Sequence, residues 1–157
     1  METRCGHLPK IVGKVCLKGY CLMFPRYSRN RKGGVADIWK ADDPNEAVWG
    51  ILYDLSKEDR DKLDIKEGYP NVYTRTQLDL ESNGQIYSGV WVYTVKDKPT
   101  IKNNFHPSEE YIDTLIRGAE QNGLPSEWIA KLQSCLLYTS DAADEGLGVD
   151  LGGRRII

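Results

Sequence analysis

The chain lacks long hydrophobic runs and has no excess of one charge. Its longest apolar runs are the length of a strand, far below the ~18 residues of a membrane-spanning helix, and Met1 to Arg4 contain no signal-peptide core. The formal net charge is −2, with acidic and basic residues scattered along the chain. Because no basic stripe is present, nucleic acid is not an expected partner. We therefore predict a cytoplasmic protein that binds neither a membrane nor nucleic acid.

Cysteine and histidine are also scarce. The four cysteines form no CxxC pair, which predicts reduced thiols: Cys5, Cys16, Cys21 and Cys135. Cys5 and His7 could hold a metal only with further ligands that the sequence does not supply, so we predict no metal site. Neither His7 nor His106 lies near a candidate nucleophile, which disfavours a catalytic triad or a Cys–His pair.

The elements that are present predict an α+β fold in one domain. The chain has 157 residues, of which 40% are hydrophobic, enough for a single core. Five segments are typical of strands: 15–24, 35–39, 48–55, 73–80 and 86–95. Asn83-Gly84 supplies the positive φ angles of a hairpin turn between the last two. Strands that alternate faces and one-sided helices favour a small closed sheet with helices packed outside it.

Three helices are predicted from their start and stop residues. Ser56 caps a short helix, with Asp59 at the capping-box position where Glu or Gln is usual. Ser108 caps a second helix, and Gly123 ends it. One face of that helix is apolar: Ile112, Leu115, Ile116 and Ala119. Ser126 begins a last short helix.

The dipeptide Glu67-Gly68 lies in the connection between the first helix and the strand 73–80. Connections between elements often carry functional side chains, so Glu67 is a candidate catalytic carboxylate. A glutamate beside a glycine is also typical of an ordinary solvated turn. From this dipeptide alone, both interpretations remain open.

The order of several short motifs resembles the γ-glutamylcyclotransferase family of small AIG2-like enzymes. The motifs are Arg26-Tyr27-Ser28, the run GGVADI at 33–38, Val48-Trp49-Gly50 with Leu52-Tyr53, Leu63-Asp64, Glu67-Gly68, Tyr73 to Arg75, Pro107-Ser108 with Tyr111, and Asn122-Gly123-Leu124-Pro125. No single motif is very specific, but their order makes the match strong. The resemblance extends from near the start of the chain to about Gln133.

The resemblance implies a small closed β-barrel with flanking helices and a site that needs no cofactor. It implies that Glu67 acts as general acid and base on a small-molecule γ-glutamyl substrate, which cyclises to 5-oxoproline as in glutathione metabolism. Gly68, Tyr73, Tyr93 and Tyr111 match positions that bind this substrate. Without the resemblance, aromatic residues in strands and helices are more often part of the core. Arg75 and Asp37 are expected to form structural ion pairs.

Both ends of the chain depart from the family pattern. No YGSN motif is present, so we expect the first barrel strand, which carries it in the family, to be missing. Residues 135–157 resemble a translated transposase-type sequencing adaptor, and we interpret them as an artefactual, disordered tail after a domain at 1–134. The alternative to an enzyme is a non-catalytic binding or structural barrel domain, or an inactive fragment of the enzyme.

Overall fold

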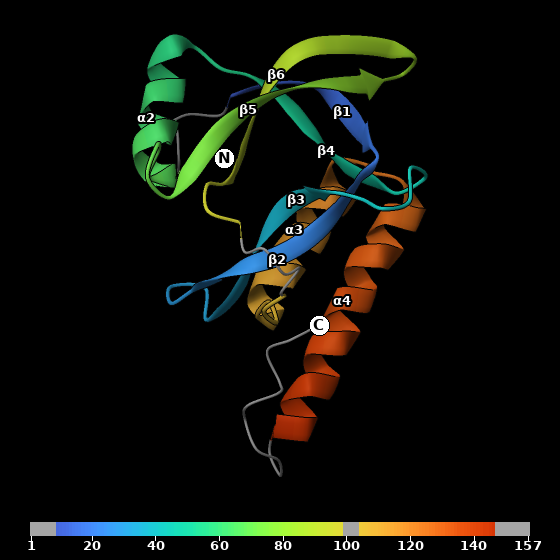
Figure 1. The fold of residues 1–157 in the computed structure, drawn as a ribbon. Helices are drawn as coiled ribbons and strands as arrows, with labels where there is room; N and C mark the ends of the chain where they lie inside the picture. The colour runs from blue at the N-terminus through green and yellow to red at the C-terminus, as the bar shows by residue number, and fades with distance from the viewer. Residues whose placement is uncertain (1–8, 99–103, 147–157) are drawn as a thin grey trace. The chain divides into compact units, whose positions relative to one another are not determined.

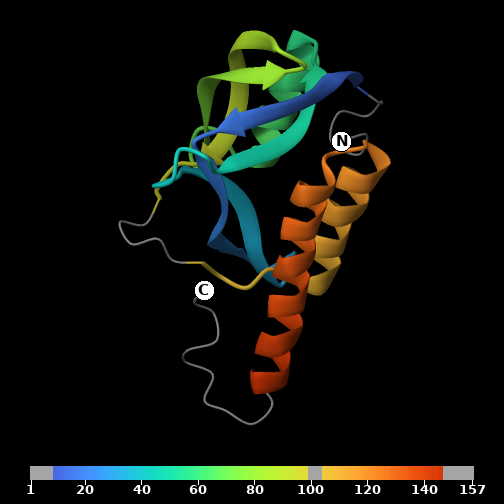
Figure 2. The same ribbon diagram turned by 90° about the vertical axis from the view of Figure 1, so that its right-hand side faces the viewer.

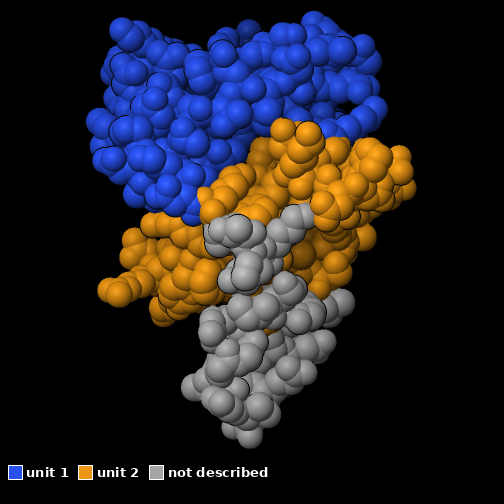
Figure 3. Space-filling view, in the orientation of Figure 1, with its two compact units in different colours: residues 1–18, 49–97 blue, residues 19–48, 98–157 orange. Residues whose placement is uncertain are grey.

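The computed structural model describes residues 9–98 and 104–146 (Figure 1). The chain divides into two compact units, which are coloured separately in Figure 3. Unit 1 takes residues 1–18 and 49–97, and unit 2 takes residues 19–48 and 98–157. Each unit is therefore assembled from two segments that are distant in the sequence.

Unit 1 is built around a four-stranded sheet with the order β4-β1-β5-β6. Its elements are β1 (Lys10–Lys18), β4 (Ala47–Asp54), α2 (Lys57–Glu67), β5 (Tyr73–Ser82) and β6 (Gln85–Val95). The predicted hairpin is confirmed: β5 and β6 pair antiparallel, and Asn83 and Gly84 have φ angles of 49° and 77°. The buried side chains of this unit include Leu63 on α2 and Leu80 and Val95 on the hairpin.

Unit 2 combines a two-stranded antiparallel sheet with two helices. Its elements are β2 (Tyr20–Ser28), β3 (Gly33–Lys40), α3 (Glu109–Gln121) and α4 (Ser126–Gly146). Figure 2 shows α3 and α4 running side by side. The buried apolar residues of the helical pair are Ile112, Ile116, Ala119, Leu124, Trp128 and Leu132, which confirms the predicted one-sided helix, although Leu115 is only half-buried.

The predicted closed barrel is wrong. In the described part of the chain, the strands form two separate sheets, and the four-stranded sheet is open, with β4 and β6 as its edges. Residues 15–24, predicted as one strand, are divided at Gly19, whose φ of 76° ends β1. The chain then enters β2, which pairs with β3 in the other sheet. The two halves of the predicted strand therefore belong to different sheets, and they do not form part of one closed sheet.

The last helix is longer than the sequence indicates. Helix α4 begins at Ser126 as predicted, but it continues to Gly146. Residues 135–146 are therefore helical, where we expected a disordered chain. Residues 147–157 lie outside the described residues. A domain boundary near residue 134 and an artefactual origin of the tail stay predictions.

The predicted cap of α2 is confirmed, and it involves a buried carboxylate. Ser56 Oγ accepts a hydrogen bond from the Asp59 backbone N–H at 3.1 Å and donates one to Asp59 Oδ2 at 2.7 Å. Asp59 is 4% exposed. The acid at the capping-box position thus accepts a hydrogen bond from the capping hydroxyl itself.

Replacing Ser56 by Ala should lower the free energy of unfolding by about 1 kcal/mol, because the cap is lost and Asp59 loses a hydrogen-bond donor. Chemical denaturation measures this change. Ser88→Ala is the matched control, because Ser88 is an exposed serine on β6. Equal stabilities of the two variants would contradict a capping role.

Candidate functional site

Glu67 is the last residue of helix α2, and Gly68 determines how the chain leaves it. Gly68 has the left-handed conformation, with φ 68°, and its N–H donates to Ile65 O at 3.2 Å. A Cβ added at Gly68 would lie 2.9 Å from Val72 Cγ2. A side chain at this position would therefore be strained by its backbone and by its neighbour. The structure gives Gly68 a helix-ending role that holds Glu67 at the tip of α2.

A tight turn carries the chain from Glu67 into β5. The N–H groups of Asn71 and Val72 both donate to Gly68 O at 2.8 Å. Val72 O in turn accepts the N–H of Lys96, just beyond β6, at 3.1 Å. Tyr73 then begins β5 and lies opposite Val95 in the antiparallel register. The turn therefore places Tyr73 at the same end of the hairpin as the tip of α2.

Asp64 joins helix α2 to both strands of the hairpin. Its Oδ1 accepts the hydroxyl of Tyr93 at 2.5 Å, and its Oδ2 lies 3.2 Å from Arg75 Nη1. Arg75 and Tyr93 are opposite each other in the β5–β6 register. The side chains of Asp64 and Arg75 are each 17% exposed, so their ion pair is far less screened than a surface pair. The expectation that Arg75 forms a structural ion pair is confirmed.

Arg75 also lies against two partly exposed aromatic rings. Its guanidinium carbon is 4.4 Å from the centre of the Tyr69 ring and 5.1 Å from that of the Trp91 ring. Such contacts stabilise a cation on a ring face. The position of Arg75 is therefore held by three neighbours, namely Asp64, Tyr69 and Trp91.

The surroundings of Tyr93 keep its phenol protonated. Burial, the hydrogen bond to Asp64, and the charges of Asp64 and Glu67 all raise the pKa of Tyr93, and Arg75 lowers it. The balance is a pKa well above the usual tyrosine range. Of these influences, the charge of Glu67 is the smallest. Glu67 and Asp64 are three residues apart, a spacing that puts them on the same helix face.

Tyr111 lies in unit 2, where its hydroxyl binds backbone. The Tyr111 oxygen accepts a hydrogen bond from the Ala36 N–H of β3 at 3.0 Å. The Arg31 guanidinium is 5.5 Å from the centre of the Tyr111 ring. These contacts connect α3 to the β2–β3 sheet. Glu67, Gly68, Tyr73 and Tyr93 therefore belong to unit 1, and Tyr111 belongs to unit 2.

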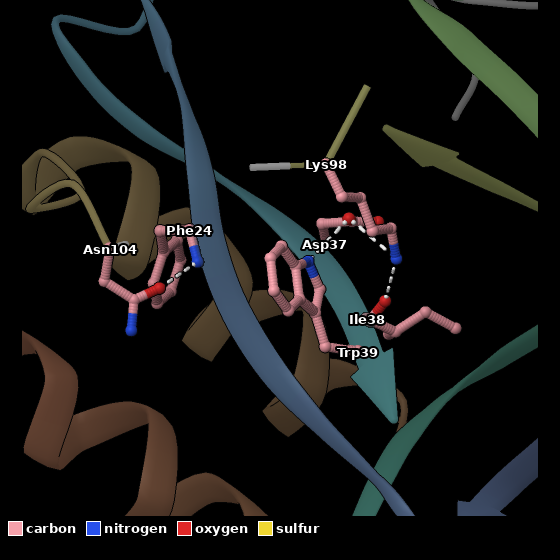
Figure 4. Close-up of polar contacts among 6 residues, drawn as sticks. All are labelled: Phe24, Asp37, Ile38, Trp39, Lys98 and Asn104. Carbon is pink, nitrogen blue, oxygen red and sulfur yellow. Dashed lines mark hydrogen bonds and ion pairs between the residues drawn. The ribbon is translucent and has the colours of Figure 1, made fainter. Parts of the chain in front are cut away.

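A second buried carboxylate, Asp37, belongs to unit 2 and is drawn in Figure 4. Asp37 Oδ2 lies 3.2 Å from Lys98 Nζ and accepts the indole N–H of Trp39 at 3.0 Å. Lys98 Nζ also donates to Ile38 O at 2.7 Å. The Asp37 side chain is fully buried, so its charge depends on these partners. The expectation of a structural ion pair is confirmed for Asp37.

No group of side chains resembles a metal centre in the part of the chain that the structure describes. Within residues 9–98 and 104–146, no three His, Cys, Asp or Glu residues are grouped as ligands would be. Cys5 and His7 lie outside the described residues. The three described cysteines, Cys16, Cys21 and Cys135, carry thiols rather than disulfides. None of the helices in the described ranges is both long and apolar enough to cross a membrane.

Sequence reasoning proposed Glu67 and Tyr93 as site residues and gave Asp64 no role. Asp64 entered only as part of the Leu63-Asp64 motif, three residues before Glu67. Its contact with Tyr93 joins residues 29 positions apart, which no local pattern reports.

Comparisons with known proteins agree with the motifs. The model of the AIG2-like family matches residues 47–132, more than half of the chain. Gamma-glutamylcyclotransferase from Bos taurus is 29% identical over 102 residues, which cover 65% of this chain and 52% of that protein. The Mus musculus protein of the same name is 27% identical over 110 residues, covering 69% and 55%. This chain spans about half the length of the curated relatives it matches.

The fold also resembles a solved structure. A structure of gamma-glutamyl cyclotransferase superposes with a TM-score of 0.74 at 23% identity, covering 84% of this chain and 77% of that one. The likeness extends the match to the α+β arrangement of antiparallel sheets and helices. At this identity it describes the fold alone.

Proposed function

The chain belongs to the AIG2-like family, and we propose that its protein is a γ-glutamylcyclotransferase. The gamma-glutamylcyclotransferases of two mammals, at modest identity, support this proposal. The structural observation that carries it is the position of Glu67 at the tip of α2, three residues after Asp64, whose carboxylate accepts the part-buried hydroxyl of Tyr93. The substrate would be a small molecule with a γ-glutamyl amide, turned over in the cytoplasm as part of glutathione metabolism.

The proposed reaction uses a nucleophile that the substrate itself supplies. The α-amine of the γ-glutamyl group attacks its own γ-carbonyl carbon, and a new C–N bond closes the five-membered ring of 5-oxoproline. The amide C–N bond breaks, and the leaving nitrogen departs as an amine or amino acid. One proton must leave the attacking amine and another must reach the leaving nitrogen, so a single carboxylate can serve as base and then as acid. Such a scheme requires no cofactor.

Glu67 is the proposed proton carrier. A carboxylate at the C-terminal end of a helix is disfavoured by the helix dipole, typically by 0.3 to about 1 kcal/mol at an exposed site. A glutamate in this position therefore costs the fold some stability, as groups retained for chemistry often do. Gly68 supports the same role by holding the tip of α2 in a conformation that other residues strain to adopt.

The remaining site residues are proposed to hold the substrate in a folded, ring-like conformer. Tyr73 and Tyr93 belong to the hairpin end that adjoins α2, which fits that role. Tyr111 is included on the family resemblance. Restricting the substrate to a reactive conformer is a large part of the rate enhancement expected for an intramolecular attack.

The test is the release of 5-oxoproline by the full-length protein. We expect time-dependent release, with an equal amount of amine, from one or more members of a panel of γ-glutamyl amino acids and γ-glutamyl amines, measured by mass spectrometry. Glutaryl amides are the matched control substrates, because they lack the α-amine and cannot cyclise. If no γ-glutamyl compound is turned over, the protein is a non-catalytic domain and this proposal is wrong.

A further inference from the structure

The hydroxyl of Tyr93 has a single proton, and the structure directs it to Asp64. The Tyr93 oxygen lies 2.5 Å from Asp64 Oδ1, and a carboxylate can only accept. The other carboxylate oxygen of Asp64 is occupied by Arg75 at 3.2 Å. Each oxygen of Asp64 therefore holds one donor, and the phenol has no second proton to offer.

The Tyr93 oxygen is left as an acceptor beside the tip of α2. With its proton committed to Asp64, its lone pairs can receive an N–H but cannot donate to a carbonyl or a carboxylate. At the reacting end of a γ-glutamyl substrate, the α-amine carries at least two N–H donors, whereas the scissile amide of a γ-glutamyl amino acid carries one. A second acceptor, the Glu67 carboxylate, lies at the end of the same helix, three residues after Asp64. This pair of acceptors suits an amine better than any other group of the substrate.

We propose that Asp64 is a positioning residue for the cyclisation: by taking the proton of Tyr93, it makes the Tyr93 oxygen an acceptor that orients the α-amine of the substrate. The inference rests on the proposed function. It adds the residue that makes the Tyr93 oxygen a hydrogen-bond acceptor, rather than a donor, where the α-amine of the substrate would bind. Asp64 itself does not touch the substrate.

The substitution Asp64→Asn tests the direction of this hydrogen bond, because asparagine keeps the shape of the aspartate side chain but has only one acceptor oxygen. Arg75 is always charged and competes with Tyr93 for that oxygen. When Arg75 takes it, the asparagine NH₂ faces Tyr93 and donates to it, so the Tyr93 proton turns away from residue 64. Tyr93 then presents a donor to the substrate amine, and the two groups no longer match.

The binding experiment is done in a Glu67→Gln background, so that the substrate is not consumed. We expect Asp64→Asn to weaken the binding of a γ-glutamyl amino acid about tenfold or more, the scale of a hydrogen bond to a charged group. The glutaryl analogue, which lacks the α-amine, should bind equally well with and without the Asp64→Asn substitution. Its unchanged affinity also verifies that the variant is folded. Asp61→Asn is the matched control, because Asp61 is an exposed acid on the same helix.

A double-mutant cycle tests whether Asp64 acts through Tyr93. Tyr93→Phe removes the acceptor, so adding Asp64→Asn to it should change the affinity for the γ-glutamyl ligand by no more than about twofold. Additive losses would overturn the proposal, and so would equal weakening of both ligands, which is the result of a merely structural role. If the parent protein binds neither ligand and releases no 5-oxoproline, the proposed function fails instead. If the parent binds and turns over but Asp64→Asn matches Asp61→Asn, only the positioning role is wrong.

Discussion

Replacing Glu67 by Gln is expected to lower the rate of 5-oxoproline release by on the order of 10²-fold or more, the scale for losing a general base. Glutamine keeps the shape of the side chain but cannot accept the proton of the attacking amine. Substrate affinity should stay within a few-fold of the parent, because the amide oxygen still accepts a hydrogen bond. Initial rates and equilibrium binding on the same preparation separate the two effects.

Stability provides an independent measurement on the same variant. Because Glu67 ends α2, removing its charge relieves an unfavourable interaction with the helix dipole. The free energy of unfolding should therefore be unchanged or slightly higher. Glu58→Gln is the matched control: Glu58 is an exposed acid in the first turn of α2 that pairs with Lys62 at 2.8 Å. Activity of the Glu67 variant within a few-fold of the parent would assign the proton transfer to another group.

A second large effect is expected at Gly34, where Ala should lower the free energy of unfolding by about 1–3 kcal/mol, the range for overpacking. A Cβ at this position would lie 2.5 Å from Phe105 O and 2.8 Å from Phe24 Cβ. The neighbouring backbone cannot easily move away, because it is hydrogen-bonded on both sides. Gly34 N–H donates to His106 O at 2.7 Å, and Phe105 N–H donates to Phe24 O at 2.8 Å.

The Asn104 side chain adds a further constraint, because its Oδ1 accepts the Phe24 N–H at 2.7 Å (Figure 4). Thermal unfolding measures the Gly34→Ala effect, which corresponds to a fall in Tm of several degrees for a chain of this size. Gly50→Ala is the control, because a Cβ at Gly50 of β4 meets no atom within 4 Å. A Gly34 variant as stable as the Gly50 variant would show that residues 104–106 give way at little cost.

The structure explains why a pair of glycines begins the GGVADI run. A Cβ at Gly33 would lie 2.6 Å from the Ser108 backbone nitrogen, so both glycines face the segment that leads into α3. The sequence indicated this run only as one of the motifs that resemble the family. It did not indicate that the reason is the close approach of a segment about 70 residues later, because such contacts leave no local pattern.

The features that the sequence determined by itself are those decided within a few residues. Asn83-Gly84 makes the hairpin turn because its positive φ angles suit few other residues, and Ser56 and Ser108 cap helices through their own side chains. The left-handed glycine that ends α2, Gly68, belongs to the same class, because such a helix end is a local event. Glu67, predicted to lie in the connection, is instead the last residue of the helix. Order and spacing of these local features were enough to indicate the family.

Only the tertiary structure decided which strands pair and which charges meet. The division at Gly19 sends β2 to a different sheet from β1, so the predicted closed barrel is an open sheet and a separate two-stranded one. Cys16 lies opposite Glu81 across β1 and β5, and Asp64 meets Tyr93 across 29 residues. Pairings of this kind depend on the free energy of many distant contacts together, whereas caps and turns depend on the dihedral angles and hydrogen bonds of a few adjacent residues.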